Sequence, residues 1–342
     1  MPDPVLSIQD LIVEFDTEDG VVHAVDGVSY DVFPGETLGV VGESGSGKSV
    51  TVMSVLGLIP RPPGRIESGT AMFKGEDLLR ASKDDMRRVR GKEIAMVFQD
   101  PMTSMNPVFK IGDQLEEAVR IHDPAISDDD ARRKAIELLE LVGVPTPERR
   151  VDQYPHEFSG GMRQRAMIAM AIANKPAVLI ADEPTTALDV TIQAQILEVL
   201  KTAQEETHAA TILITHDLGL IAEMADRVVV MYAGQVVEMA DVETIFKSPR
   251  HPYTLGLMNS LPRLEADEER LIPIQGQPPS LINVPPGCPF HPRCYLRNGR
   301  AICIEQNPPL EAVDRPEHIS ACHFKQEMKG DTSKFADGEV AS

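Results

Sequence analysis

The fold is decided by the stretch Gly42-Glu43-Ser44-Gly45-Ser46-Gly47-Lys48-Ser49, which reads G-x-x-x-x-G-K-S. An apolar run, Thr37–Val41, comes before it, and a run of helical character, Val50–Met53, follows it. Strand, loop and helix in this order are the context that a phosphate-binding loop requires. Glycines let the chain turn sharply and aim successive N–H groups inward, while the helix N-terminus adds its positive dipole end. The stretch therefore predicts a nucleoside triphosphate site, the alternative being a Gly/Ser-rich surface turn with a chance lysine.

Two side chains at the end of this loop have predicted chemical roles. Lys48 would reach the β- and γ-phosphates of the nucleotide, and the hydroxyl of Ser49 would coordinate Mg²⁺. The other loop residues would offer backbone N–H groups to the phosphates. We therefore expect the nucleotide contacts to run from Gly42 to Val50.

The composition limits the classes of partner. The chain has 342 residues, which is enough for about two domains. Its 33 Lys and Arg against 53 Asp and Glu give a net charge of −20, which disfavours nucleic acid and anionic lipid surfaces, although a local basic patch stays open. No apolar run reaches the length of about 18 residues that suggests a membrane span. The acidic start, Met1–Pro4, does not resemble a secretory signal. We expect a cytoplasmic protein, in which cysteines rarely form structural disulfides.

Apolar and β-branched runs alternate with helical patterns along most of the chain. Ser127 precedes apolar residues at helical spacing that end at Gly143, so we expect a capped helix within a mostly helical insert over about 105–170. A second helix is predicted from Ser159 to Ala173. Strands are predicted over residues 5–13, 25–33, 37–41, 71–73, 94–98, 177–180, 211–214 and 228–231. The last three are continuous apolar runs of the kind that a parallel sheet buries on both faces. Together these patterns predict an α/β fold.

One of the apolar strands ends in two carboxylates, Asp182 and Glu183. In nucleotide-hydrolysing proteins with a phosphate loop, a neighbouring strand brings such an acid to the metal. Asp182 would hold Mg²⁺ through water, and Glu183 would act as the general base, a role that contributes about 10²–10⁴-fold to a rate. The alternative is an acidic strand end that faces solvent.

A short polar segment, Ser159-Gly160-Gly161, precedes the second predicted helix. Ser159 is well placed as its N-cap, and the glycines leave backbone N–H groups open to an anion. Ordinary capped helices also begin with Ser-Gly. The segment is informative because Gly161 lies 21 residues before Asp182.

Six motifs stand in the order found in the ATP-binding cassette of ABC transporters, and the chain resembles that family over about residues 5–250. The motifs are Gly42–Ser49, Gln99, Ser159-Gly160-Gly161, Asp182-Glu183, Ala187-Leu188-Asp189 and His216. The resemblance implies a phosphate-loop NTPase core that binds ATP and Mg²⁺.

The resemblance also implies roles for single residues that alone would pass for polar surface. Gln99 would link the metal and the attacking water to the membrane partner, and His216 would contact the γ-phosphate. Asp189 would lie in the segment that crosses a dimer interface. Ser159 and Gly161 would clamp the γ-phosphate of ATP bound by the opposite cassette.

Two further positions bear on the resemblance. Phe15 fits the aromatic residue on which the family stacks adenine, a contact that contributes about 1–3 kcal/mol where bases stack on aromatic rings. The alternative for Phe15 is a core position on a strand. The signature segment departs from the commoner Leu-Ser-Gly-Gly-Gln, with Phe158 and Met162 at its ends. Because the serine and both glycines are intact, we expect hydrolysis to survive.

The composition changes after residue 247. Of the 27 prolines, 13 lie between Pro249 and Cys322, together with all four cysteines. This density of proline opposes long helices and central strands. We predict an ATPase domain over residues 1–247, a loop-rich extension over 248–325, and a disordered tail over 326–342.

The extension resembles the C-terminal region of oligopeptide and dipeptide importer ATPases. The matching segments are Ser248–Leu255, Leu261-Pro262, Gly287–Cys294, Cys303 and Ala321–His323. The resemblance implies a peripheral subunit on the cytoplasmic face of the inner or plasma membrane. Its implied partners are a second ABC ATPase subunit, itself or a related chain, two transmembrane permease subunits and an extracytoplasmic substrate-binding protein, with no nucleic acid.

Three other functions stay open at this point. The same importer class moves nickel and other small solutes. A soluble, non-transport ABC ATPase acting on DNA or ribosomes would normally carry two cassettes, a coiled coil or a basic face, which this sequence lacks. A small-molecule kinase also has a phosphate loop, but it has no reason to carry Ser159-Gly160-Gly161.

The four cysteines follow the spacing C-x₅-C-x₈-C-x₁₈-C, from Cys288 through Cys294 and Cys303 to Cys322. Clustered thiols in a cytoplasmic chain suggest a metal site. The absence of a C-x-x-C pair weakens a zinc ribbon, and the bacterial ferredoxin run does not match. Resemblance to members that hold a [4Fe–4S] cluster favours that cluster, with zinc second and four reduced structural thiols as the alternative. His291 and His323 are predicted to be structural.

Overall fold

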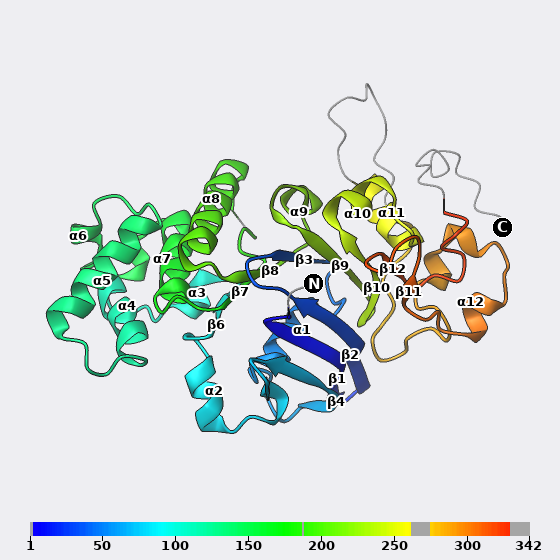
Figure 1. Ribbon diagram of the computed structural model, residues 1–342, viewed down its shortest axis with the longest axis horizontal. Helices are drawn as coiled ribbons and strands as arrows, with labels where there is room; N and C mark the ends of the chain where they lie inside the picture. The colour runs from blue at the N-terminus through cyan, green and yellow to red at the C-terminus, as the bar shows by residue number, and fades with distance from the viewer. Residues whose placement is uncertain (1–2, 187, 261–273, 329–342) are drawn as a thin grey trace. The chain divides into compact units, whose positions relative to one another are not determined.

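The computed structural model describes residues 3–186, 188–260 and 274–328 (Figure 1). The contacts within the chain divide it into two compact units. The first unit comprises Met1–Leu6, Asp31–Thr37 and Met72–Ile214. The second unit comprises Ser7–Tyr30, Leu38–Ala71 and Thr215–Ser342, so it contains both the phosphate loop and the extension. The domain boundaries at 247 and 325 stay predictions. Three predicted features lie outside the described residues: Ala187, Leu261-Pro262 and the tail from residue 329.

A parallel sheet forms the core of the first unit. It joins β6 (Ile94–Val97), β7 (Val178–Asp182) and β8 (Ala210–Thr215) in that order. Every residue of β7 and β8 is buried, which is why these strands are continuous apolar runs. Because the strands are parallel, their carboxyl ends share one edge, where Asp182 and the segment after β6 emerge. A short strand, β5 (Glu76–Asp77), pairs antiparallel with the end of β4 (Gly64–Phe73).

Helices make up the stretch between β6 and β7, as the sequence predicted. Within it α4, α5 and α7 pack on one another, and α7 also contacts β6 and α8 (Figure 1). Ser127 caps α5 by accepting the N–H of Asp130 at 3.1 Å, and Ser159 caps α7 by accepting the N–H of Met162 at 3.3 Å. The α-helices of this unit are α2 (Lys83–Val89), α3 (Pro101–Ser104), α4 (Ile111–Arg120), α5 (Asp128–Leu141), α6 (Pro147–Arg150), α7 (Gly160–Ile172) and α8 (Val190–Thr207).

The second unit holds the strands around the phosphate loop. In it β3 (Thr37–Val41) pairs in parallel with β9 (Arg227–Tyr232). A further sheet places β2, β1 and β4 side by side in that order. The remaining elements before the extension are β1 (Leu6–Thr17), β2 (Gly20–Val32), α1 (Lys48–Val55), α9 (Leu218–Met224), β10 (Gln235–Asp241) and α10 (Val242–Lys247).

The sequence did not predict strand β10, which pairs antiparallel with β9. Ala233 and Gly234 join the two strands, both with positive φ, at 48° and 82°. Two central residues with positive φ make the tight turn whose twist suits a hairpin. The strand was missed because Glu238 interrupts its apolar run, and a register irregularity lies between Val236 and Glu238.

The extension consists of short elements, as its proline content predicted. One of them, β12, pairs antiparallel with β10, placing Ser320 opposite Glu238, and β11 pairs with β12. The extension therefore continues the sheet of the phosphate-loop unit. Its elements are α11 (Pro252–Asn259), the 3₁₀ helices η3 (His291–Arg293) and η4 (Tyr295–Arg297), α12 (Ile302–Glu305), β11 (Glu311–Ala312) and β12 (Ile319–Ser320).

The carboxylate of Glu238 anchors two segments of the extension to β10. Its side chain is fully buried and accepts the N–H of Arg250 at 2.5 Å, the N–H of His251 at 3.0 Å and a hydrogen bond from Nε2 of His318 at 2.8 Å. A buried carboxylate is tolerated only when its hydrogen bonds are satisfied, as they are here. This polar residue in an apolar strand is therefore an attachment point.

We expect Glu238→Ala to destabilise the phosphate-loop unit by about 3 kcal/mol, because it leaves buried donors without their acceptor. Urea unfolding of the whole chain, followed by circular dichroism, measures the change. The control is Glu243→Ala on α10, whose ion pair with Lys247 is exposed on both sides, and it should change stability by less than about 0.5 kcal/mol. Equal losses in the two variants would contradict the anchoring role of Glu238.

Candidate functional site

The phosphate loop joins β3 to α1 through backbone that suits glycine. Gly42, Gly45 and Gly47 have φ of +155°, +78° and +100°. A Cβ on Gly42 would lie 2.2 Å from the carbonyl oxygen of Met231, and one on Gly47 would lie 2.5 Å from the carbonyl oxygen of Ala24. Two of the three glycines are therefore required both by conformation and by the close approach of neighbouring backbone.

The side chains inside the loop suit an anion. Lys48 is buried, and its Nζ donates to the carbonyl oxygens of Gly42 at 2.7 Å and Glu43 at 3.0 Å, so the ammonium group lies against the loop. The hydroxyl of Ser46 is also buried and has no hydrogen-bond partner among the residues that the structure describes. An ammonium group, an unsatisfied hydroxyl and the N-terminus of α1 together fit a phosphate group.

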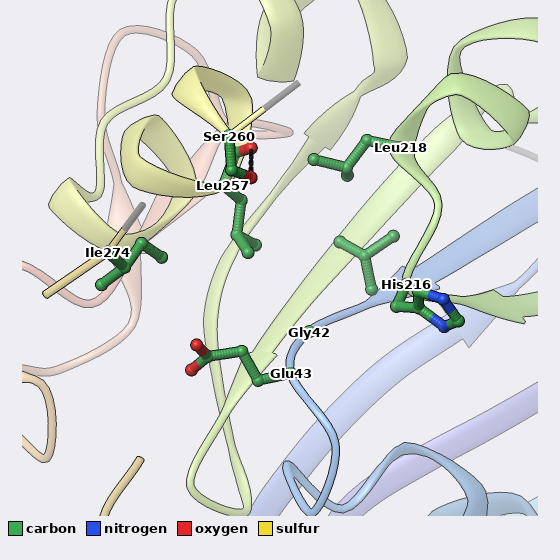
Figure 2. Close-up of a pocket in the computed structure, with 8 residues that line it drawn as sticks. Gly42, Glu43, His216, Leu218, Leu257, Ser260 and Ile274 are labelled. Atoms are coloured by element: carbon green, nitrogen blue, oxygen red, sulfur yellow. Dashed lines mark hydrogen bonds between the residues drawn. The ribbon is translucent and has the colours of Figure 1, made fainter. Parts of the chain in front are cut away.

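A cavity of about 300 Å³ opens beside the start of the loop (Figure 2). His216, in the turn before α9, lines it together with Gly42 and Glu43, so the structure places the predicted γ-phosphate contact beside the phosphate loop. Leu257 and Ser260, at the end of α11, line another part of the wall. The sequence did not predict that the extension reaches this cavity.

In the first unit, Glu183 and Gln99 meet although 84 residues separate them. Oε2 of Glu183 accepts from Nε2 of Gln99 at 3.0 Å and from the hydroxyl of Thr186 at 2.9 Å. Glu183 itself has a φ of +46°, which is uncommon for a residue with a side chain, and its N–H donates to the carbonyl of Ile214 at 2.8 Å. Such strain concentrates at functional sites, where it holds a side chain in a set direction. Asp182, the last residue of β7, is buried next to it.

The segment Ser159-Gly160-Gly161 opens α7 and has an exposed start. Ser159 and Gly160 are exposed, whereas a Cβ on Gly161 would lie 2.9 Å from Cγ2 of Ile192 on α8. Asp189 caps α8 by accepting the N–H of Ile192 at 3.0 Å. The two predicted interface segments therefore meet at one isoleucine, and both have a structural task besides their predicted role.

Comparison with protein families accounts for most of the chain. A model described as "ABC transporter" matches residues 25–186, and one described as "Oligopeptide/dipeptide transporter, C-terminal region" matches residues 237–303. Over 319 residues the chain is 54% identical to the oligopeptide transport ATP-binding protein OppD of Bacillus subtilis (strain 168), covering 92% of this chain and 88% of that protein. The chain belongs to the ABC transporter ATP-binding proteins.

Other relatives agree with this ABC ATPase assignment. The dipeptide transport ATP-binding protein DppD of Bacillus subtilis (strain 168) is 50% identical over 323 residues, covering 94% of this chain and 95% of that protein. The ATP-binding cassette MJ0796, solved as a dimer in a post-hydrolysis state with ADP and Pi, has a TM-score of 0.62 at 25% identity. The match covers 69% of this chain and 98% of MJ0796. These findings confirm the predicted phosphate-loop α/β fold and an ATPase coupled to transport.

The family also implies where the ABC ATPase works. This ABC ATPase associates with permease subunits and an ATPase partner as a peripheral subunit at a membrane. Among the helices that the structure describes, none combines the length and the hydropathy needed to cross a bilayer.

Phe15 lies on β1 and is half-buried. A Cβ on Gly64 would lie 3.0 Å from Cε1 of its ring, so the ring packs against the start of β4 and is not enclosed on all sides. This position is compatible with both the predicted adenine contact and a core role.

The four cysteines line one small cavity in the extension. Burial raises the pKa of Cys288 to about 11 and those of Cys294 and Cys322 to about 12. The cavity measures about 10 Å³, room for one water at most. Within residues 3–186, 188–260 and 274–328, no three or more His, Cys, Asp or Glu side chains are grouped to hold a metal ion. As it stands, the cavity is too small for the predicted [4Fe–4S] cluster or a zinc ion and would have to widen to hold either.

The two histidines near the thiols make hydrogen bonds with main-chain carbonyls. Nδ1 of His291 lies 2.9 Å from the carbonyl oxygen of Cys288, and Nε2 of His323 lies 3.0 Å from that of Gln306. These contacts agree with the predicted structural role of both rings.

We expect Gly42→Ala to raise the Kd for ATP by at least about tenfold, because the new methyl group would collide with the carbonyl of Met231 and displace the loop. Isothermal titration calorimetry with Mg²⁺-ATP measures this Kd. The comparison variant is Gly45→Ala, where the φ is also positive but no atom lies within 4 Å of the added Cβ. A loss of affinity at Gly45 as large as that at Gly42 would contradict the argument from close approach.

Proposed function

We propose that this ABC ATPase hydrolyses ATP to drive the import of di- and oligopeptides. The observation that carries the proposal is the identity of 54% and 50% over nearly the whole chain to proteins named for oligopeptide and dipeptide transport. The extension supports it, since the family model that matches it is described by the same solutes. Nickel and other small solutes of the same importer class are the alternative cargo.

The proposed nucleotide chemistry assigns one role to each residue of the sequence motifs. Lys48, the loop N–H groups and the start of α1 would neutralise the charge that develops on the phosphates. The resemblance to ABC ATPases assigns Mg²⁺ binding to Ser49, Asp182 and Gln99, and Mg²⁺ would supply further positive charge to the phosphate oxygens when bound. Glu183 would orient and deprotonate the attacking water; its bonds to Gln99 and Thr186 support this role because they fix the direction of the carboxylate.

Two ATPase chains are proposed to act together. Ser159 and Gly161 would clamp the γ-phosphate held by the partner ATPase, and Asp189 would lie at the interface between the two chains. The exposure of Ser159 supports this, as does the dimeric state of MJ0796. ATP would close the pair and hydrolysis would let it reopen.

The remaining partners and the domain limits are proposals of the same kind. We place the ATPase domain at 1–247, the extension at 248–325 and a tail at 326–342. An extracytoplasmic substrate-binding protein would deliver the peptide, and the ATPase would bind the permeases from the cytoplasmic face. The exposed apolar residues Val108 and Phe109, at 72% and 51% exposure, follow the Gln99 segment and offer a surface for the permeases.

Glu183→Gln tests the ATPase and the importer together. We expect it to keep the Kd for ATP within about twofold and to lower kcat by at least about 100-fold, because the amide cannot take a proton from water. Peptide uptake by cells that depend on this chain should stop as well. Glu205→Gln, on the exposed side of α8, is the control and should match the parent. Turnover at the parental rate would disprove the assignment of the base, and normal peptide uptake in cells lacking the chain would disprove the cargo.

The cysteine site is a separate proposal, in which the four thiols share one [4Fe–4S] cluster, or zinc in second place. The observation in its favour is that all four line one cavity, which would have to widen. The protein purified without oxygen should then be coloured and contain iron by metal analysis. Replacing Cys294 by Ser should lower the iron content. A colourless, metal-free chain would leave four structural thiols.

A further inference from the structure

The extension holds Glu43, the second residue of the phosphate loop, by its side chain. The guanidinium group of Arg293 donates from Nη1 to Oε2 of Glu43 at 2.6 Å and from Nη2 to Oε1 at 2.9 Å. Two parallel N–H···O bonds of this kind fix both the distance and the orientation of the carboxylate. Because 250 residues separate the partners, neither the loop motif nor the cysteine motif indicates the contact by itself.

Arg293 is itself held in place on several sides. Its side chain is only 5% exposed. Nε donates to the carbonyl of Gln275 at 3.0 Å, and Nη1 donates to the hydroxyl of Tyr232 at 3.3 Å. The guanidinium carbon lies 5.8 Å from the centre of the Tyr232 ring and 5.9 Å from that of Phe290. A planar, buried cation with directed donors is a rigid support.

The main chain of Glu43 is held as well. Its N–H donates to the hydroxyl of Tyr253 at 2.8 Å, and Tyr253 on α11 is fully buried. Its carbonyl oxygen accepts from the N–H of Ser46 at 3.2 Å and from Nζ of Lys48 at 3.0 Å. One residue therefore joins two side chains of the extension to the lysine that is proposed to bind phosphate.

We propose that Arg293 is a positioning residue for the nucleotide: it acts through Glu43 to hold the phosphate loop and Lys48 in the geometry that binds ATP. The extension is then a working part of the ATP site. The proposal rests on the proposed function of the loop. A lysine at position 293 would provide a single point of attachment and would not replace the bidentate pair.

A docking contact would also account for a buried ion pair, so the test must separate the two roles. If Arg293 only fastens the extension, its loss lowers thermal stability and leaves the ATP affinity of the folded protein unchanged. If it positions the loop, ATP affinity falls, and the fall depends on Glu43. A double-mutant cycle measures the coupling between Arg293 and Glu43 directly.

The experiment measures the Kd for Mg²⁺-ATP by titration calorimetry on the full chain, with Tm recorded for each variant. We expect Arg293→Gln to raise the Kd about tenfold, with Arg293→Lys in between. Glu43→Gln should have a similar effect, and the double variant should be no weaker than either single variant. Arg250→Gln is the matched control, because it breaks a part-buried pair with Asp314 in the same unit and should leave the Kd unchanged.

Three results would overturn the proposal: a parental Kd for folded Arg293→Gln, effects that multiply in the double variant, or an equal loss in Arg250→Gln. Tyr253→Phe removes a single hydroxyl and tests the same proposal if Arg293→Gln does not fold. It should raise the Kd because the N–H of Glu43 loses its acceptor, and a parental Kd there would count against the proposal. A parental chain that binds no ATP would refute the nucleotide function itself, which is a different outcome.

Discussion

The close approach of backbone at Gly42 is the constraint on which the ATP-binding half of the molecule depends. The carbonyl of Met231, on β9, occupies the space where any Cβ at position 42 would lie. The loop can therefore leave β3 only as glycine permits, and this exit aims the N–H groups and Lys48 inward. Parallel pairing of β3 with β9 fixes the two strands that meet at this point. Binding chemistry and strand packing thus come from the same steric requirement.

The proposed hydrolytic site has a comparable constraint at Glu183. Its positive φ turns the chain immediately after β7, and the N–H bond to Ile214 holds that turn against the next strand. Gln99 and Thr186 then fix one oxygen of the carboxylate. A general base, the role proposed for Glu183, loses little conformational entropy on binding water when its carboxylate is already fixed in this way. In both places the side-chain geometry depends on a positive-φ backbone conformation that few residue types adopt.

Local rules of sequence predicted the parts of this structure that are local. The caps at Ser127 and Ser159 and the buried strand β7 follow from short patterns, and the structure has them within a residue or two. The resemblance gave Gln99 its predicted role, but its hydrogen bond to Glu183 was not predicted, since no periodicity connects the two residues. Strand β10 was missed because Glu238 breaks its apolar pattern, although its carboxylate binds the extension. The contact from Arg293 to Glu43 was missed because charge pairs far apart in sequence leave no pattern.

The extension joins two chemical environments through one short turn. The 3₁₀ helix η3 carries Arg293 toward the phosphate loop and is followed at once by Cys294, whose thiol lines the cysteine cavity. Burial raises the pKa of that thiol to about 12. Arg293 and Cys294 are adjacent in the chain, and both follow the turn in which the N–H of Arg293 donates to the carbonyl of Phe290 at 3.0 Å. The packing that holds the cysteine segment therefore also helps to set the position of the residue that pairs with Glu43.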